Sequence, residues 1–342
     1  MTISNAHNLM KGYIKAIEER NSPNPVEEAL DAVLEQRFKL FNKSSKDLAD
    51  LETGSVQTAI TSQPYHEMRK YPKGVSNDKI PFGQEPTTDE FIKRSVEFYS
   101  GVKRVLKDYG SLFVNLGESY NDGVSSLTTH KFAVEMVKDG WYLVQSLKWR
   151  KLNTKPQGKI RRLRPVTEEI FHFVKNNESF KYKEPVFWSR DEKITTQTGC
   201  NDENPGDHRV SPLKFSLKRP RVSFTDFLDS QHVQGVIEGC AFNWSKLKKI
   251  DPTFIHVAPA PDYLPIIPIL MTTDVGDTVL DIFSGSGTFL DTALRLGRNG
   301  VGFDTDPNSI KFSEKRLVLA LKEEISIDEL YRIESQYFLN AA

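Results

Sequence analysis

One stretch near the carboxyl end of the chain constrains the fold more than any other, because it reads as strand, loop, helix and strand in succession. Residues 278–282 and 299–303 have the apolar pattern of buried strands, residues 288–296 read as a helix, and the loop has the sequence DIFSGSGT, residues 281–288. This succession predicts a βαβ unit of a parallel sheet that is covered by helices.

The loop of this unit has the features of a ligand-binding turn. Gly285 and Gly287 leave the backbone bare where it bends and approaches a ligand, and Thr288 opens a helix whose N-terminal amides face that ligand. Asp304 ends the second strand, where an acid can accept hydrogen bonds from both hydroxyls of a ribose. The loop fits neither GxGxxG nor GxxxxGK(S/T), so pyrophosphate and triphosphate are not expected as ligands. Two glycines also occur in turns that bind nothing, but the acid one strand later favours an adenosine site.

The hydrophobic pattern divides the chain into four parts. Residues 1–50 read as a helical extension. Residues 51–175 alternate strands with helices, and residues 176–250 are polar and without periodicity, which indicates an insert. Residues 251–342 contain a short helix and the βαβ unit. Within 51–175 we expect strands at 56–60, 111–116, 142–149 and 168–175, helices at 89–106 and 128–138, and a turn at 108–110.

Composition excludes several classes of protein. The 46 Lys and Arg residues balance 46 Asp and Glu residues, so the overall charge does not argue for a nucleic-acid partner. Cys200 and Cys240 lie far apart, which excludes a cysteine-based zinc site and a disulfide framework, and no metal is expected. The N-terminus lacks the apolar core of a signal peptide, and no run approaches the roughly 18 to 20 apolar residues that span a bilayer. We therefore expect a cytoplasmic protein with no membrane partner.

Residues 256–304, HVAPAPDYLPIIPILMTTDVGDTVLDIFSGSGTFLDTALRLGRNGVGFD, resemble the cofactor-binding half of the amino-group DNA methyltransferases. That family's pattern runs HP..FP..L, then GD.VLDPF.GSGTT, then A...GR..IG.E. The chain departs from it at Val257 and Ile282, where the family has proline, and at Asp304, where Glu is commoner. The resemblance implies S-adenosylmethionine as cofactor, and the implied cofactor residues are Asp281, Phe283, Gly285, Gly287, Thr288, Asp304 and His256.

A second resemblance to the same family covers residues 51–175. LETGSVQTAITSQPY, residues 51–65, is similar to the family's L.dgSvdliiTSPPY, and residues 89–120 and 141–156 are similar to later family stretches. The catalytic motif thus precedes the cofactor loop, which is the circularly permuted order of the family's beta class. The implied fold is α/β, a Rossmann-like class I methyltransferase with a mixed sheet, helices on both faces and an inserted target-recognition region at 176–250.

The Ser-Gln-Pro-Tyr loop at residues 62–65 suits methyl transfer to an exocyclic amine. Hydrogen-bond acceptors localise the amine's lone pair on nitrogen and favour in-line attack on the sulfonium methyl group. The resemblance assigns the acceptor roles to the Ser62 hydroxyl and the Gln63 carbonyl, the shape of the loop to Pro64, and stacking on a flipped-out base to Tyr65. Any residue supplies a carbonyl, so we expect Gln63→Pro to keep or raise activity. Methylation of cytosine carbon 5 needs a Pro-Cys loop, which the chain lacks.

Two basic stretches without an acid suit contacts with DNA phosphates. Residues 148–164 hold eight Lys or Arg and residues 208–221 hold five, although such runs are also common on solvated faces.

Trp149 reads either as an aromatic near the flipped base or as a core residue. Four other residues match family positions near the pocket but read as capping or loop partners: Glu85, Asn115, Glu118 and Tyr120. The candidate DNA contacts are Trp149, Arg161, Arg162, Arg164, Arg209, Lys214, Lys218, Arg219 and Arg221.

These features together predict a site-specific DNA methyltransferase of a bacterial restriction-modification system. Serine as the first motif residue favours the N4 amine of cytosine, with N6 of adenine as the alternative. The expected partners are double-stranded DNA and a cognate restriction endonuclease acting at the same site, with the protein a monomer or homodimer associated with the nucleoid. A catalytically silent DNA-binding homologue is a further alternative, because Gln63 replaces proline. A third alternative is a methyltransferase that acts on RNA or protein.

Overall fold

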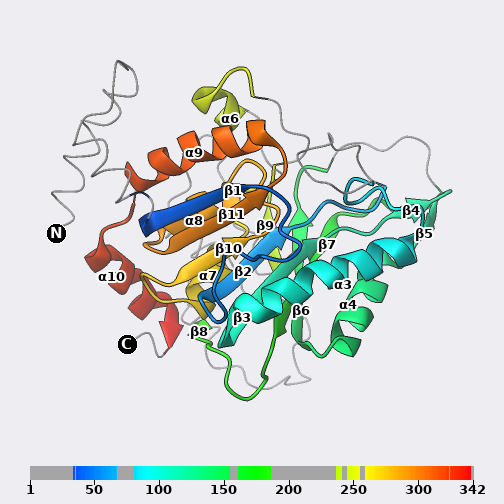
Figure 1. The fold of residues 1–342 in the computed structure, drawn as a ribbon, viewed down its shortest axis with the longest axis horizontal. Helices are drawn as coiled ribbons and strands as arrows, with labels where there is room; N and C mark the ends of the chain where they lie inside the picture. Colours follow the sequence, from blue (N-terminus) through cyan, green and yellow to red (C-terminus); the bar gives the residue numbers. More distant parts are fainter. Residues whose placement is uncertain are drawn as a thin grey trace, which may run out of the picture.

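The computed structural model describes residues 34, 36–67, 80–154, 161–185, 236–240, 245–254, 259–322 and 324–339. Their main feature is an eight-stranded sheet with the order β1-β11-β10-β2-β3-β7-β6-β9 (Figure 1). β7 runs antiparallel to both of its neighbours, and the other neighbouring strands pair in parallel. The strands are β1 (Phe38–Asn42), β2 (Val56–Ser62), β3 (Leu106–Leu116), β6 (Tyr142–Lys151), β7 (Thr167–Val174), β9 (Val236–Gly239), β10 (Thr278–Asp281) and β11 (Asn299–Asp304).

Helices cover both faces of this sheet, as the sequence predicts (Figure 1). Successive residues of β2 and β3 alternate between two buried clusters, so Ala59 and Leu112 pack on one side and Ile60 and Phe113 on the other. The helices are α3 (Thr88–Val105), α4 (Thr128–Lys138), α6 (Ser245–Ile250), α7 (Ile266–Thr272), α8 (Thr288–Arg295), α9 (Pro307–Lys322) and α10 (Ile327–Tyr337). Two small antiparallel pairs are separate from this sheet: β4 (Tyr120–Asn121) with β5 (Val124–Ser125), and β8 (Glu184–Pro185) with β12 (Phe338–Leu339). None of the described helices is long and apolar enough to cross a membrane.

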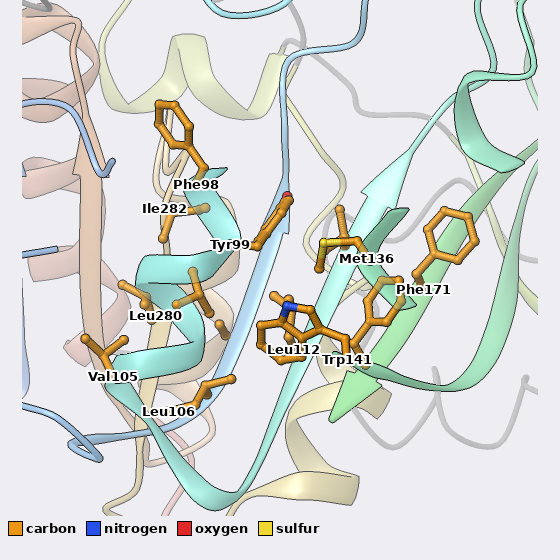
Figure 2. Close-up of a cluster of buried hydrophobic side chains, with 14 of the residues drawn as sticks. Phe98, Tyr99, Val105, Leu106, Leu112, Met136, Trp141, Phe171, Leu280 and Ile282 are labelled. Carbon is orange, nitrogen blue, oxygen red and sulfur yellow. The ribbon is translucent and has the colours of Figure 1, made fainter. Parts of the chain in front are cut away.

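Helix α3 anchors the larger of the two clusters. Thr87 caps its N-terminus by accepting a 3.2 Å hydrogen bond from the amide of Glu90, and acidic residues fill its first turn and basic residues its last turn. Its apolar face packs on the sheet: Figure 2 shows Phe98, Tyr99 and Val105 among side chains from β3, β7 and β10. The helix is thereby fixed against the strands that carry the candidate site.

The structure corrects the expectation that residues 1–50 are helical. Residues 1–33 lie outside the described part, but Phe38–Asn42 form β1, which pairs in parallel with β11 at the edge of the sheet. Phe38 and Leu40, two residues apart, pack on the cluster formed by α8 and α9, whereas Phe41 stacks on Phe303 at 4.7 Å. This two-residue alternation is that of a strand with both faces covered.

Two other stretches differ from the sequence-based expectation. The turn expected at residues 108–110 is part of β3. The pairing of β2 with β3 shifts its register at this point, between Val56 and Thr58 of β2. Residues 236–239, expected within the insert, form β9 and pair with the second half of β6, where Ile237 is buried. Residues 186–235 of the expected insert lie outside the described part of the chain.

Candidate active site

Two loops that lie far apart in the sequence meet at the carboxyl ends of neighbouring strands. β2 ends at Ser62 and leads into the Ser-Gln-Pro-Tyr loop, whereas β10 ends at Asp281 and leads into the glycine-rich loop. The two strands pair in parallel, so both loops leave the same edge of the sheet. Thr61 Oγ1 donates a 2.7 Å hydrogen bond to Asp281 Oδ1 and so joins the two loops directly.

Two carboxyl groups hold the glycine-rich loop. Gly285 and Gly287 adopt φ angles of 50° and 70°, which glycine reaches without strain. Asp304 Oδ2 accepts a 2.8 Å hydrogen bond from the amide of Gly285, and Asp281 Oδ1 accepts one of 3.1 Å from the amide of Phe283. Burial raises the pKa of Asp281 to about 7, helped by the charge of Asp304, and burial raises the pKa of Asp304 to about 6. Both carboxyls therefore exchange protons close to neutral pH.

Helix α9 supports the same loop through residues that the sequence did not single out. Ser313 Oγ donates to the carbonyl of Gly285 at 2.7 Å, and Arg316 donates to Thr288 Oγ1 at 2.9 Å. Arg316 also forms a buried ion pair of 3.2 Å with Asp291. These residues lie on an amphipathic helix and match no motif, so only their contacts identify them.

The Ser-Gln-Pro-Tyr loop is tied to the ends of β3 and β7. Ser62 Oγ donates to Asn115 Oδ1 at 3.1 Å, and Tyr65 Oη lies 2.8 Å from that same oxygen. Tyr65 Oη also lies 2.6 Å from Glu168 Oε2, and Glu168 in turn forms an ion pair with Lys151. Glu168, at the start of β7, was predicted only as part of a strand, because nothing in its local sequence reveals that it faces Tyr65.

Gln63 and Pro64 complete this loop. Pro64 lies against Gly83, where an added Cβ would come within 3.3 Å of the proline Cβ. The Gln63 side chain is buried; its Nε2 donates to Ser95 Oγ at 3.3 Å and its Oε1 accepts from Tyr99 Oη at 2.6 Å. The sequence predicted a role for the carbonyl of Gln63 and none for its side chain.

Residues 56–315 match the model of a protein family described as DNA methylase. The chain belongs to this DNA methylase family. The match spans both loops described above, and the family uses S-adenosylmethionine as methyl donor.

Individual DNA methylases are similar to the chain over different lengths. It is 24% identical to "Type II methyltransferase M.HpaI" of Haemophilus parainfluenzae, over 90% of this chain and 85% of that protein. It is 33% identical to "Type II methyltransferase M.MwoI" of Methanothermobacter wolfeii, over 43% of this chain but only 22% of that longer protein. Among solved structures, PvuII DNA methyltransferase (cytosine-N4-specific) shares the fold, with a TM-score of 0.58, 18% identity, and coverage of 88% of this chain and 92% of that one.

The glycine-rich loop of this DNA methylase fits an adenosine-containing cofactor. Asp304 is half-buried at the end of β11, and its two oxygens accept hydrogen bonds of 2.8 Å from the amides of Gly285 and Asp306. A carboxylate has about four lone-pair sites, so capacity for a ribose hydroxyl remains. Phe283 lies in an aromatic group with Phe82 at 4.8 Å and Phe98 at 5.5 Å. His256 lies outside the described residues.

The other predicted site residues of the methylase divide into core, cap and surface positions. Trp149 is buried in the cluster around α7, and its indole donates to Tyr263 Oη at 2.8 Å, which supports the core alternative. Glu118 caps α4 by accepting from the amide of Thr128 at 3.0 Å, and Glu85 pairs with Arg94 at 2.7 Å, as their interpretation as structural partners predicts. No metal-binding group occurs among the residues that the structure describes.

The predicted DNA contacts fall only partly within the described chain. Arg161 and Arg164 are exposed, and the guanidinium carbon of Arg162 lies 3.7 Å from the centre of the Tyr120 ring in the β4–β5 pair. The remaining basic candidates, in the expected insert, lie outside the described residues: Arg209, Lys214, Lys218, Arg219 and Arg221.

Proposed function

We propose that this DNA methylase transfers a methyl group to the exocyclic N4 amine of a flipped-out cytosine in double-stranded DNA. The observation that carries the proposal is the hydrogen bond of 2.7 Å between Thr61 and Asp281, which brings the Ser-Gln-Pro-Tyr loop beside the glycine-rich loop. Donor and acceptor sites adjoin each other at one edge of the sheet, as a direct transfer requires.

The hydrogen bonds around Ser62 prepare its hydroxyl to accept. The Asn115 amide nitrogen donates to the carbonyl of Glu169 at 3.0 Å, which turns Asn115 Oδ1 toward Ser62. Ser62 donates its single proton to that oxygen at 3.1 Å, so its lone pairs remain available for a hydrogen of the target amine. The Gln63 carbonyl is the second acceptor, and the two together localise the lone pair of the amine on nitrogen.

The contacts of Tyr65 suit it for stacking on the extruded base. Its hydroxyl is held between Asn115 at 2.8 Å and Glu168 at 2.6 Å, which fixes the position of the outer end of the side chain. Glu168 is buried, and Lys151 forms an ion pair with it. S-adenosylmethionine supplies the electrophilic methyl group when it is bound at the glycine-rich loop.

The choice of cytosine over adenine rests on Ser62 as the first motif residue. It is tested by mass spectrometry of nucleosides from DNA methylated by the protein. We expect N4-methylcytosine; N6-methyladenine without N4-methylcytosine would overturn the choice.

The proposed biological setting is a restriction-modification system, because the curated relatives are named type II methyltransferases. In that setting a cognate endonuclease cleaves the unmethylated form of the same site. Methylation-sensitive sequencing of DNA from a host that expresses the protein would give the site, and methylation scattered without a common sequence would count against this setting.

The silent-homologue alternative is tested separately by transfer of radiolabelled methyl groups to several DNAs. Binding of S-adenosylmethionine without any transfer would favour that alternative over catalysis.

A further inference from the structure

We propose that Gln63 is a positioning residue whose side chain ties the Ser-Gln-Pro-Tyr loop to helix α3. In the amino-group methyltransferases that the loop resembles, a proline occupies this position and restricts the backbone through its ring. Here the side-chain amide would restrict the loop through hydrogen bonds. This inference rests on the proposed function, because it concerns the placement of the carbonyl that accepts the target amine.

Both ends of the Gln63 amide are engaged in a site closed to water. The residue is 1% exposed, its Nε2 donates to Ser95 Oγ at 3.3 Å, and its Oε1 accepts from Tyr99 Oη at 2.6 Å. Ser95 donates its own proton to the carbonyl of Phe91 at 2.8 Å, so its lone pairs are available to Gln63. Donors and acceptors therefore match. Rotating the amide by half a turn would set Oε1 against the lone pairs of Ser95 Oγ and leave the proton of the Tyr99 hydroxyl without its acceptor.

Helix α3 is a rigid support for this contact. Tyr99 is 0% exposed within the cluster that also contains Phe98 and Val105 (Figure 2). Adjacent residues of the helix reach the two halves of the site: Tyr99 bonds the catalytic loop through Gln63, and the Phe98 ring lies 5.5 Å from the Phe283 ring of the glycine-rich loop. One helix therefore sets the position of both loops.

The tether acts next to the reacting centre. The carbonyl of Gln63 belongs to the residue whose side chain is held, and Pro64 already restricts the same residue to extended conformations. Because misplacement by about 1 Å can cost about 100-fold in rate, loss of the tether is expected to lower the rate of the chemical step.

A double substitution separates positioning from stability. Gln63→Met leaves the Tyr99 hydroxyl buried without an acceptor, and Tyr99→Phe leaves Gln63 Oε1 without a donor, so each single variant should be less stable. The pair of substitutions together removes both polar groups, and stability should recover toward that of the wild type. Tyr331→Phe, at an exposed tyrosine of α10, is the matched control.

The readouts are the single-turnover rate of methyl transfer to unmethylated DNA, the dissociation constant of S-adenosylmethionine and the melting temperature, with rates measured well below the lowest melting temperature. We expect the double variant to bind the cofactor as the wild type does and to transfer at least about 10-fold more slowly. A double variant that transfers at the wild-type rate overturns the inference while leaving the proposed function intact. A wild-type protein that transfers no methyl group overturns the proposed function itself.

Discussion

Thr61 donates a 2.7 Å hydrogen bond to Asp281, a residue 220 positions later in the chain. Thr61 directly precedes Ser62, the proposed acceptor for the target amine, and Asp281 opens the glycine-rich loop. Since Asp281 is buried and titrates near neutral pH, the state of its proton affects the junction of the two loops.

The stability of the protein should depend on this titration. Burial raises the pKa of Asp281 to about 7 and that of Asp304 to about 6, so between about pH 4 and pH 7 these two carboxyls bind more protons in the native state than in the unfolded state. Their contribution to the free energy of unfolding should therefore fall as pH rises through this window and level off above it. The buried His172, whose pKa burial lowers to about 3, contributes in the opposite direction below about pH 6.5. Urea denaturation across the window should show a shallower fall in Asp281→Asn than in the wild type. Asp108→Asn, at an exposed aspartate, is the control, and an unchanged slope in Asp281→Asn would contradict the assignment.

Ser62→Ala should lower methyl transfer by about 100-fold or more, because it removes one of two acceptors for the target amine. Cofactor affinity should stay unchanged, since the hydroxyl of Ser62 donates to Asn115, at the end of β3. Single-turnover kinetics and calorimetric titration measure the two effects. Ser55→Ala, at an exposed serine just before β2, serves as control, and equal rates for the two variants would rule out the role of Ser62.

Gly287→Ala and Gly54→Ala form a matched pair with φ angles of 70° and 69°. Both should lose about 1–2 kcal/mol of stability from backbone strain. Only at Gly287 would the new Cβ meet a neighbour, Ser313 Oγ at 3.0 Å, whereas Gly54 has nothing within 4 Å. Ser313 donates to the carbonyl of Gly285, so Gly287→Ala alone should also weaken binding of S-adenosylmethionine. Equal cofactor affinity in the two variants would argue against binding at this loop.

Arg162→Ala should weaken DNA binding to a similar degree for all DNA sequences. It should also reduce the slope of log affinity against log salt concentration by about 1, because one phosphate contact is lost. Lys39→Ala provides the control, because β1 lies at the opposite edge of the sheet from β9. Fluorescence anisotropy at several salt concentrations gives both slopes. An Arg162→Ala slope equal to that of the wild type would exclude a phosphate contact.

The structure reverses the expectation for Gln63→Pro. From the sequence this change should keep or raise activity. In the structure it would leave the buried Tyr99 hydroxyl without an acceptor, which should lower the free energy of unfolding by about 1–3 kcal/mol. We now expect Gln63→Pro to unfold at lower denaturant concentration and to transfer methyl groups more slowly. Activity at or above the wild-type level would restore the earlier expectation.

Local signals in the sequence were enough to place much of the sheet and the two loops. Thr87 marks the start of α3, the alternation of β2 marks a strand, and the glycine spacing marks the turn after β10. Each of these signals arises from residues within one turn or one strand, where backbone preferences and hydrophobic period act directly.

The contacts that complete the site depend on residues distant in the chain. Glu168 reaches Tyr65 across 103 positions, and Tyr99 reaches Gln63 across 36. β1 is a strand because β11 lies beside it, and its five residues carry no strong signal of their own. Such features follow from tertiary packing, which local preferences do not encode.

The strand order also bears on the synthesis of the protein. β2 lies between β3 and β10, and β1 pairs with β11. β1 and β2 are therefore synthesised more than 200 residues before β11 and β10, with which they pair. A nascent chain that stalls on the ribosome before residue 278 holds the Ser-Gln-Pro-Tyr loop but has neither β10 nor the glycine-rich loop. Chains of that length therefore lack half of the site, and the edges of β1 and β2 that pair with β11 and β10 stay open until those two strands have been made.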